Sequence, residues 1–154
     1  MEEAFFLNFE EMDWCYRARA AGYSSYAVPD AKLWHKVSVS FGGEESPLRQ
    51  YFMVRNELLW ARRHLPMRER VRVTQKILLR MLPGFSLGEP GKHGFAQRLY
   101  WETTRYILEV NRRRHQPYYQ AQLYGIMDYL RRRFGDCPPS IRKKLVETRD
   151  DAAS

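Results

Sequence analysis

The spacing of apolar residues predicts a mainly helical chain with two short strands near its N-terminus. A run of apolar and aromatic residues leads into the stretch FFLNFEEMDWCYRARAAGY, at positions 5–23, which is predicted to form a helix. From Pro47 onward, apolar residues recur at spacings of three and four, as expected for amphipathic helices. Five helices are predicted in this part, at about 48–64, 67–82, 95–114, 118–134 and 139–146.

The two strands are predicted at 24–28 and 31–41, with the turn pair Pro29-Asp30 between them. In the second strand apolar and polar residues alternate, which is the pattern of a half-buried strand. His35 falls on the apolar side of this alternation, together with Leu33 and Val37. A lone histidine there can be either a hydrogen-bonded core residue or a metal ligand.

Residues of the first predicted helix provide signals for both of its ends. Asn8 is a suitable N-cap, Glu11 stands three residues later as in a capping box, and Gly22 follows the helix as a C-terminal stop. Glu10 and Asp13 also lie near the positive end of the helix dipole. Capping and the dipole would explain all three acids without any catalytic role.

Two side chains on the predicted helices are expected to form polar pairs. Asp13 and Arg17 are four residues apart, so they can pair across one helical turn. Arg55 lies among apolar residues of the 48–64 helix and therefore needs a partner, either a carboxylate or a bound phosphate. The 118–134 helix carries a continuous apolar stripe, predicted to be core, and Gly135 is expected to end it.

Composition limits the class of partner more than the fold. The 154 residues are enough for one domain with a core. With 26 Lys and Arg against 18 Asp and Glu, the net charge of +8 suits an anionic partner such as nucleotide phosphate, nucleic acid or an acidic membrane surface. The two cysteines form no metal-ligand spacing, so we expect a reducing, cytoplasmic compartment. No signal peptide and no run long enough to span a membrane is predicted.

Charge divides the chain into two regions. Acidic residues gather before about Glu57, whereas arginines are concentrated after it, most densely at 112–114 and 131–133. We therefore expect one unit at 1–45, a helical region at 46–148 and a disordered tail at 149–154.

The order of these features resembles the second half of the family 2 glycosyltransferases, especially bacterial rhamnosyltransferase-like members. The similar stretches are FFLNFEEMDWCYRARAAGY, AVPDAKLWHKVSVSFGG, YFMVRNELLWARRHLP and LYGIMDYLRRRFG, so the resemblance runs from about 3 to 135. It implies an α+β, mostly α-helical piece of a GT-A, Rossmann-like fold. It also implies transfer of a sugar, with inversion, from a nucleotide-sugar to a glycan or lipid-linked acceptor, as in bacterial cell-wall polysaccharide biosynthesis.

The resemblance assigns roles to individual residues. Glu11 matches the acid that takes the acceptor proton as a general base, although the family usually has Asp there. The extra methylene of Glu moves the oxygens by about 1.5 Å, one carbon-carbon spacing. Asp13 is the alternative base, and Glu10 is expected to orient the acceptor. The family also implies a divalent metal, Mn or Mg, with His35 near it, and a phosphate-neutralising role for Arg55.

The resemblance also implies that the donor-binding half of the enzyme is missing from this chain. Family members bind the nucleotide with an N-terminal half that carries an Asp-x-Asp motif, and the sequence contains no such motif. We therefore expect a C-terminal fragment that is inactive alone. Its partner would be the missing half or a second copy of the chain.

Two other classes of function fit the charge. A nucleic-acid-binding module is not favoured, because the arginines are spread over several helices and no recognition motif is present. A non-catalytic module that binds an anionic membrane surface is the stronger alternative, because the basic helices are amphipathic and rich in Trp, Tyr and Phe. Peripheral attachment to the inner face of the cell membrane is compatible with the enzyme interpretation, since acceptors can be lipid-linked.

Overall fold

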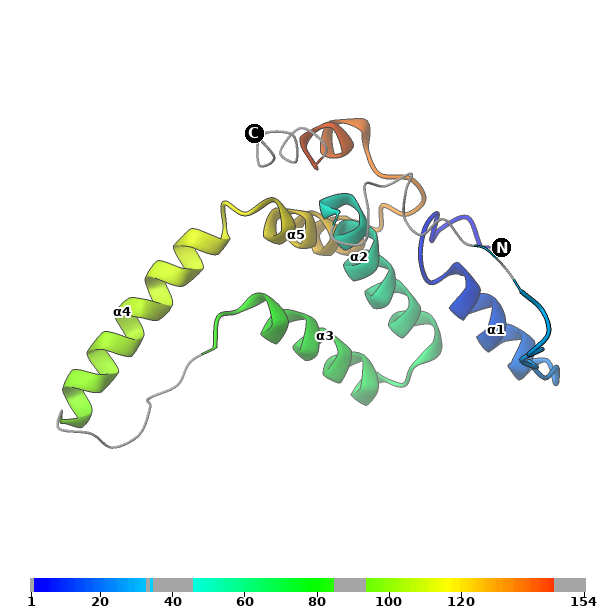
Figure 1. Ribbon diagram of the computed structural model, residues 1–154, viewed down its shortest axis with the longest axis horizontal. Coiled ribbons are helices and arrows are strands. Elements are labelled where there is room, and N and C mark those ends of the chain that lie inside the picture. Colours follow the sequence, from blue (N-terminus) through cyan, green and yellow to red (C-terminus); the bar gives the residue numbers. More distant parts are fainter. Residues whose placement is uncertain (1, 33, 35–45, 85–93, 146–154) are drawn as a thin grey trace.

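The computed structural model describes residues 2–32, 34, 46–84 and 94–145, apart from the side chains of residues 95 and 98. Figure 1 shows the helices in these ranges. They are α1 (Glu10–Ala20), α2 (Pro47–His64), α3 (Met67–Met81), α4 (Phe95–Arg113) and α5 (Pro117–Leu130). A short helical segment at 139–145 follows α5. Every regular secondary-structure element among the described residues is therefore a helix, and the helices from Pro47 onward agree with the 3.6-residue spacing.

The prediction of an α+β fold is wrong for the described residues, which form helices, turns and loops without any strand or sheet. Residues 24–28, predicted as a strand, are exposed and have no neighbouring strand to pair with. A strand is stable only when its backbone groups bond to another strand, so an apolar pattern alone is not sufficient. The other candidate, 31–41, lies mostly outside the described residues. A GT-A, Rossmann-like sheet is accordingly not what these residues build.

The C-terminal end of α1 confirms the expected role of Gly22. This residue has a φ of 88°, which glycine adopts without steric cost. Its N–H donates to the carbonyl of Arg19 at 3.0 Å, and the N–H of Tyr23 donates to that of Ala18 at 3.0 Å. This is a Schellman motif, which satisfies carbonyls left free at the helix end.

Two predicted helix ends are wrong. Asn8 does not cap α1, because the helix begins at Glu10 and no side chain caps its N-terminus. Helix α5 ends at Leu130, before the predicted stop at Gly135. There Arg132 takes the left-handed conformation, with a φ of 57°, and the N–H of the next residue donates to the Asp128 carbonyl at 2.8 Å. A non-glycine residue thus ends α5, which composition does not reveal.

Helix α2 lies at the centre of the fold and contacts both α5 and α3. Its start combines Pro47 in the first turn with the side chain of Ser46, which accepts a bond from the Arg49 N–H at 3.5 Å. Two apolar clusters share α2. The first cluster joins α2 to α5 and the C-terminal segment, and its buried members are Leu48, Tyr51, Phe52, Ala121, Cys137 and Leu145. The second joins α2 to α3, and its buried members are Val54, Leu58, Ile77 and Met81.

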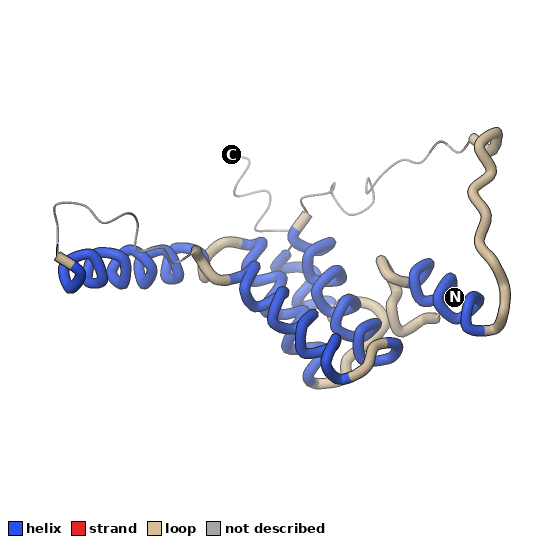
Figure 2. The backbone as a smooth tube through the Cα atoms, turned by 90° about the horizontal axis from the view of Figure 1, so that it is seen from below, coloured by secondary structure: helices blue, strands red, loops and turns tan. Residues whose placement is uncertain are grey.

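Helix α4 extends away from the α2 and α5 pair, as Figures 1 and 2 show from two directions. It leads directly into α5 through a short turn near residue 115. Large apolar side chains on α4 are exposed, among them Tyr100, Trp101, Ile107 and Leu108. Among the described helices, none combines the length and apolar character needed to cross a membrane.

Candidate functional site

The backbone just before α1 is strained. Phe6, Asn8 and Phe9 have φ values of 60°, 62° and 71°, in the left-handed region that non-glycine residues avoid. Each such residue costs on the order of 1 to 3 kcal/mol, and such conformations persist only where surrounding contacts hold them. The segment carries Glu10 and Glu11 at its end, so these contacts decide where the two acids lie.

Asn56 supplies most of the contacts that hold this segment. Its side chain is fully buried on α2, and its Nδ2 group lies 2.8 Å from the carbonyl oxygen of Phe5, 2.6 Å from that of Leu7 and 3.0 Å from that of Asn8. These carbonyls belong to the strained residues or their neighbours. One side-chain amide thus provides hydrogen-bond donors for backbone carbonyls that the unusual conformation keeps out of a helix or sheet.

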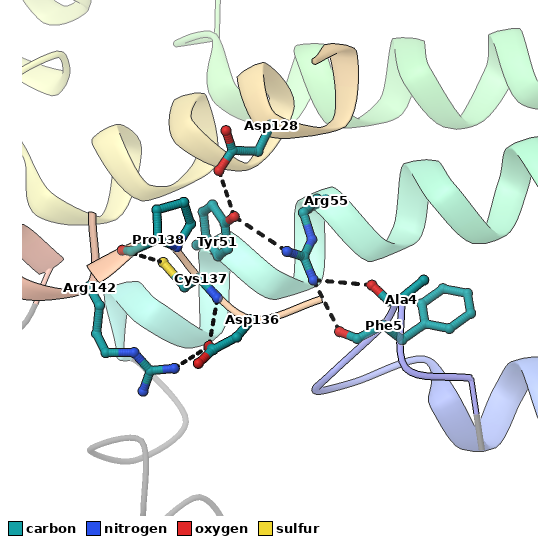
Figure 3. A network of polar contacts seen from close by, with 9 residues as sticks. All are labelled: Ala4, Phe5, Tyr51, Arg55, Asp128, Asp136, Cys137, Pro138 and Arg142. Carbon is teal, nitrogen blue, oxygen red and sulfur yellow. Dashed lines mark hydrogen bonds and ion pairs between the residues drawn. The ribbon is translucent and has the colours of Figure 1, made fainter. Parts of the chain in front are cut away.

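Arg55, the residue before Asn56, binds the same segment from the core (Figure 3). Its guanidinium donates to the Phe5 carbonyl at 3.1 Å and to the Ala4 carbonyl at 3.5 Å, and its Nε donates to Asn56 Oδ1 at 3.0 Å. The side chain has 0% exposure. The polar partners that the sequence analysis required for Arg55 are therefore mainly backbone carbonyl groups. In this arrangement the guanidinium is buried and is not exposed to a phosphate.

A buried acid, Asp128, balances the charge of Arg55 indirectly, through the hydroxyl group of Tyr51. The Tyr51 hydroxyl donates to Asp128 Oδ2 at 2.7 Å, and Arg55 Nη1 donates to the same hydroxyl oxygen at 3.4 Å (Figure 3). Burial and the bond to Asp128 raise the pKa of Tyr51. Tyr51 therefore stays protonated, and it links the charges of α2 and α5 through a neutral hydroxyl.

The segment after α5 closes the other side of the N-terminal residues. The N–H of Gly135 donates to the Ala4 carbonyl at 2.9 Å. Next to it Asp136 accepts bonds from the Cys137 N–H, at 2.6 Å, and from Arg142 (Figure 3). Burial raises the pKa of Cys137 to about 11, so its thiol is not a ready nucleophile.

A hollow of about 490 Å³ lies where these two segments meet. Four of its lining residues are acids, and the lining consists of Glu2, Glu3, Phe6, Glu10, Gly135 and Asp136. An acidic hollow with an aromatic wall can accept hydrogen bonds from neutral hydroxyl groups while repelling anions. It is the described cavity closest in composition to a binding site for a polyhydroxylated acceptor.

Glu10 reaches this hollow from the first turn of α1. Its Oε2 atom is buried and has no hydrogen-bond partner among the described residues. Burial, with the neighbouring charge of Glu11, raises the pKa of Glu10, although a backbone hydrogen bond acts in the opposite direction. A ligand hydroxyl can reach this oxygen only after the atoms that cover it move. Glu11 follows it on α1, is exposed, and forms no hydrogen bond or ion pair with another described residue.

Asp13, one turn further along α1, is occupied by protein partners. It is 1% exposed, and its Oδ2 accepts from Arg17 Nε at 2.8 Å, which confirms the predicted pair. Its Oδ1 lies 2.7 Å from His64 Nε2 at the end of α2. Burial acts to raise the pKa of Asp13, but the bonds from His64 and Arg17 outweigh it and lower the pKa. Oδ1 therefore joins α1 to α2, whereas the bond of Oδ2 to Arg17 lies within α1.

The predicted metal ligand His35 lies outside the described residues. Among the described side chains, no three His, Cys, Asp or Glu groups lie together in a way that could hold a metal ion. Among the described residues, the acids of the hollow therefore do not form an arrangement that fits a divalent ion. The metal and the role of His35 stay predictions.

Sequence reasoning brought together Glu10, Glu11 and Asp13, and the structure shows that Asp13 differs from the other two because other side chains bind both of its oxygens. It missed Asn56, His64 and Asp136. Asn56 had one signal, since an amide on the buried face of an apolar helix requires polar partners. His64 and Asp136 had none, because their partners lie 51 and six residues away and depend on the fold.

Comparison with known proteins points to a sugar transferase over part of the chain. Part of this chain is 33% identical, over 75 residues, to the dTDP-rhamnosyl transferase RfbF of Shigella flexneri. The similarity covers 44% of this chain and 25% of the relative, so the chain spans about a quarter of the relative's length. No protein-family model matches the sequence, and no solved structure matches it.

Proposed function

We propose that this chain is the acceptor-activating part of a glycosyltransferase, which transfers a sugar from a nucleotide-sugar to a hydroxyl group with inversion. Partial similarity to a dTDP-rhamnosyl transferase supports the reaction class. It makes a dTDP-linked sugar the first donor to test. The acceptor that we propose is a glycan or a lipid-linked glycan, whose hydroxyl groups suit the acidic hollow beside α1.

The observation that carries the proposal is the strained segment before α1 and the buried groups that hold it. Three left-handed residues, two of them phenylalanines, precede Glu10 and Glu11. Strain of this kind lowers the stability of the fold. It is concentrated at sites where side chains must be placed accurately. Here it places two adjacent acids at the beginning of a helix, one beside a hollow and one exposed to solvent.

In the proposed reaction Glu11 accepts the proton of the acceptor hydroxyl as its oxygen attacks the anomeric carbon of the donor. The bond between that carbon and the nucleotide diphosphate breaks, and the diphosphate leaves with the electron pair. Glu11 is suited to this role because no described residue engages its carboxylate, whereas Asp13 uses both oxygens internally. Glu10 would accept a hydrogen bond from the acceptor, because its side chain lines the hollow.

The donor site is the part of the proposal that lies beyond this chain. Because the chain spans a quarter of the relative, we propose that the nucleotide and any divalent metal are bound by other parts of a longer protein. Isothermal titration of this chain with dTDP-rhamnose and Mn²⁺ should then give no binding. Tight binding by the chain alone would contradict this assignment of the donor site.

Substitution within the longer transferase tests the catalytic roles. Glu11→Gln should reduce kcat by at least about 100-fold, the usual contribution of a general base, with little change in KM for the donor. Glu10→Gln should mainly raise KM for the acceptor. Glu69→Gln on α3 is the matched control and should leave both unchanged. A Glu11→Gln enzyme with undiminished kcat and native circular dichroism would rule out Glu11 as the base.

A further inference from the structure

Helix α4 has an open face that the rest of the described chain leaves uncovered. Tyr100, Trp101, Ile107 and Leu108 are 64%, 61%, 60% and 64% exposed. They form two pairs seven residues apart, so they lie on the same side of the helix over two turns. Such exposure of four large apolar residues on one helix face is uncommon for a helix surrounded only by water.

Charge is distributed around this face in a particular way. Its neighbours on the helix include Thr104 and Asn111, which are uncharged, and Arg105 and Arg112, which lie along one edge. The two acids of α4, Glu102 and Glu109, lie on the opposite side and are paired with arginines, at 2.8 Å to Arg105 Nη2 and 2.9 Å to Arg112 Nε.

The open face therefore presents no carboxylate to an approaching surface, while positive charge lies at its edge. Over 95–114 the sequence has five arginines and two glutamates, which gives 5 − 2 = +3. A basic helix with exposed aromatic and aliphatic residues on one side has the composition of helices that lie in the interface of a bilayer. Tyr and Trp suit that position, since each ring combines an apolar body with a polar group.

A second copy of the chain fits this face less well. A helical dimer needs an apolar stripe at heptad positions over three or four heptads, and α4 has only 19 residues. Its exposed apolar pairs lie on both sides of Thr104 and Asn111, so a partner helix packed on the centre of the face would bury two uncharged polar residues in the seam.

We propose that the open face of α4, defined by Tyr100, Trp101, Ile107 and Leu108, binds the surface of a bilayer that contains anionic phospholipid. The helix lies parallel to the surface, with these four side chains among the upper acyl chains and Arg105 and Arg112 at the headgroup phosphates. Helix α4 extends away from the α2 and α5 pair (Figure 2), and the exposure of these four side chains leaves the face accessible. This proposal does not rest on the proposed transferase activity.

Vesicle sedimentation with the purified 154-residue chain tests the proposal. Vesicles of phosphatidylcholine with 30% phosphatidylglycerol, a composition chosen as roughly the anionic content of a charged leaflet, should bind the chain and pure phosphatidylcholine should not. The double variant Ile107→Gln and Leu108→Gln should reduce the partition coefficient by about tenfold or more, because two apolar side chains no longer enter the bilayer. Arg105→Gln with Arg112→Gln should weaken binding only to the anionic vesicles.

A matched control is available on α3. Leu78 and Leu79 are exposed by 47% and 68%, and changing both to Gln removes the same chemistry from another helix. This control should leave partitioning unchanged, and circular dichroism should show that both double variants are folded. Equal loss in the α3 variant, or binding that ignores lipid charge, would overturn the assignment to α4. Light scattering that shows a dimer lost on Ile107→Gln and Leu108→Gln would assign the face to a second copy instead.

Discussion

Asn56 is the residue on which the geometry of the acidic segment most depends. Its amide has two N–H groups and lies within hydrogen-bond distance of three carbonyl oxygens, all in the four residues from Phe5 to Asn8. The oxygens come from residues in or next to the left-handed conformations, where no helix or sheet could use them. A single buried side chain therefore stabilises a backbone path that has little intrinsic stability.

Replacing Asn56 by Ala should lower the free energy of unfolding by about 2 to 4 kcal/mol, because buried carbonyl groups lose their donor. Urea unfolding followed by circular dichroism measures the change. Asn111→Ala, at an exposed position on α4, provides the control and should change stability by less than about 0.5 kcal/mol. A small loss for Asn56→Ala would mean that the strained segment is held mainly by Arg55.

Asp13 should give the chain a stability that depends on acid pH. Its folded-state pKa lies below the ordinary value of 3.8, so the folded protein holds the ionised form more strongly than the unfolded chain does. The stabilisation is complete above that value and is lost as the pH falls through the lower folded pKa. Asp13→Asn should flatten the acid side of a plot of stability against pH, whereas Asp30→Asn, at an exposed turn, should leave it as it is.

Glu10 should behave in the opposite sense. Because its folded pKa is above the ordinary value of 4.5, folding is favoured by the protonated form and loses stability as the pH rises through that range. Glu10→Gln, which cannot ionise, should therefore unfold at a higher temperature than the parent at pH 7. A lower melting temperature would show that the carboxylate has a partner that stabilises it.

At this scale the sequence predicts acids at the beginning of α1 but does not distinguish among them. Local spacing correctly pairs Asp13 with Arg17, since four residues along a helix define a contact. It cannot reveal that His64, from another helix, engages the second oxygen. For the same reason it does not reveal the bonds of Arg55 to backbone carbonyls, because such a contact has no signature in side-chain identity.

Helix α5 approaches α2 closely at Gly125. A Cβ atom placed on this glycine would lie 2.6 Å from the Tyr51 carbonyl oxygen and 3.4 Å from the Arg55 nitrogen. Both are backbone atoms, so neither can rotate away. The absence of a side chain at Gly125 thus permits the spacing of the two helices that together contain Tyr51, Arg55 and Asp128.

Gly125→Ala should destabilise the chain by about 1 to 3 kcal/mol, because the added methyl group forces α5 away from α2. The intrinsic preference of Ala for helices would act in the other direction, by about 1 kcal/mol. Chemical unfolding measures the balance. Gly84→Ala, outside the helices and with no atom within 4 Å of the added Cβ, is the control and should have little effect.

Helices were predictable from the sequence and strands were not. Apolar periodicity over 14 to 19 residues gives many independent positions that agree, which is why α2 to α5 lie close to their predicted ranges. Residues 24–28 offer only five positions, and whether such a run becomes a strand depends on a partner elsewhere in space. The end of α5 at Leu130 followed from packing, since the left-handed conformation of Arg132 is not a preference of arginine.

At the scale of the whole molecule, stability should fall from the α2 and α5 pair outward to α4. The two helices share a buried core, whereas α4 leaves most of its large side chains exposed. Hydrogen exchange should therefore be slowest for the amides of α2 and much faster for those of α4, which can open without disturbing the core. Equal protection along α4 and α2 would show that α4 is covered by a partner in solution.

The hydrogen bond between Gly135 and Ala4 has a consequence for how the chain is made. The acidic segment leaves the ribosome before the groups that hold it, which come from α2 and, last of all, from a residue 131 positions later. Helices α1 and α2 can form as they emerge, since their hydrogen bonds are local. The hollow beside Glu10 can close only once residue 135 is outside, so the candidate site matures after nearly all of the described chain has been synthesised.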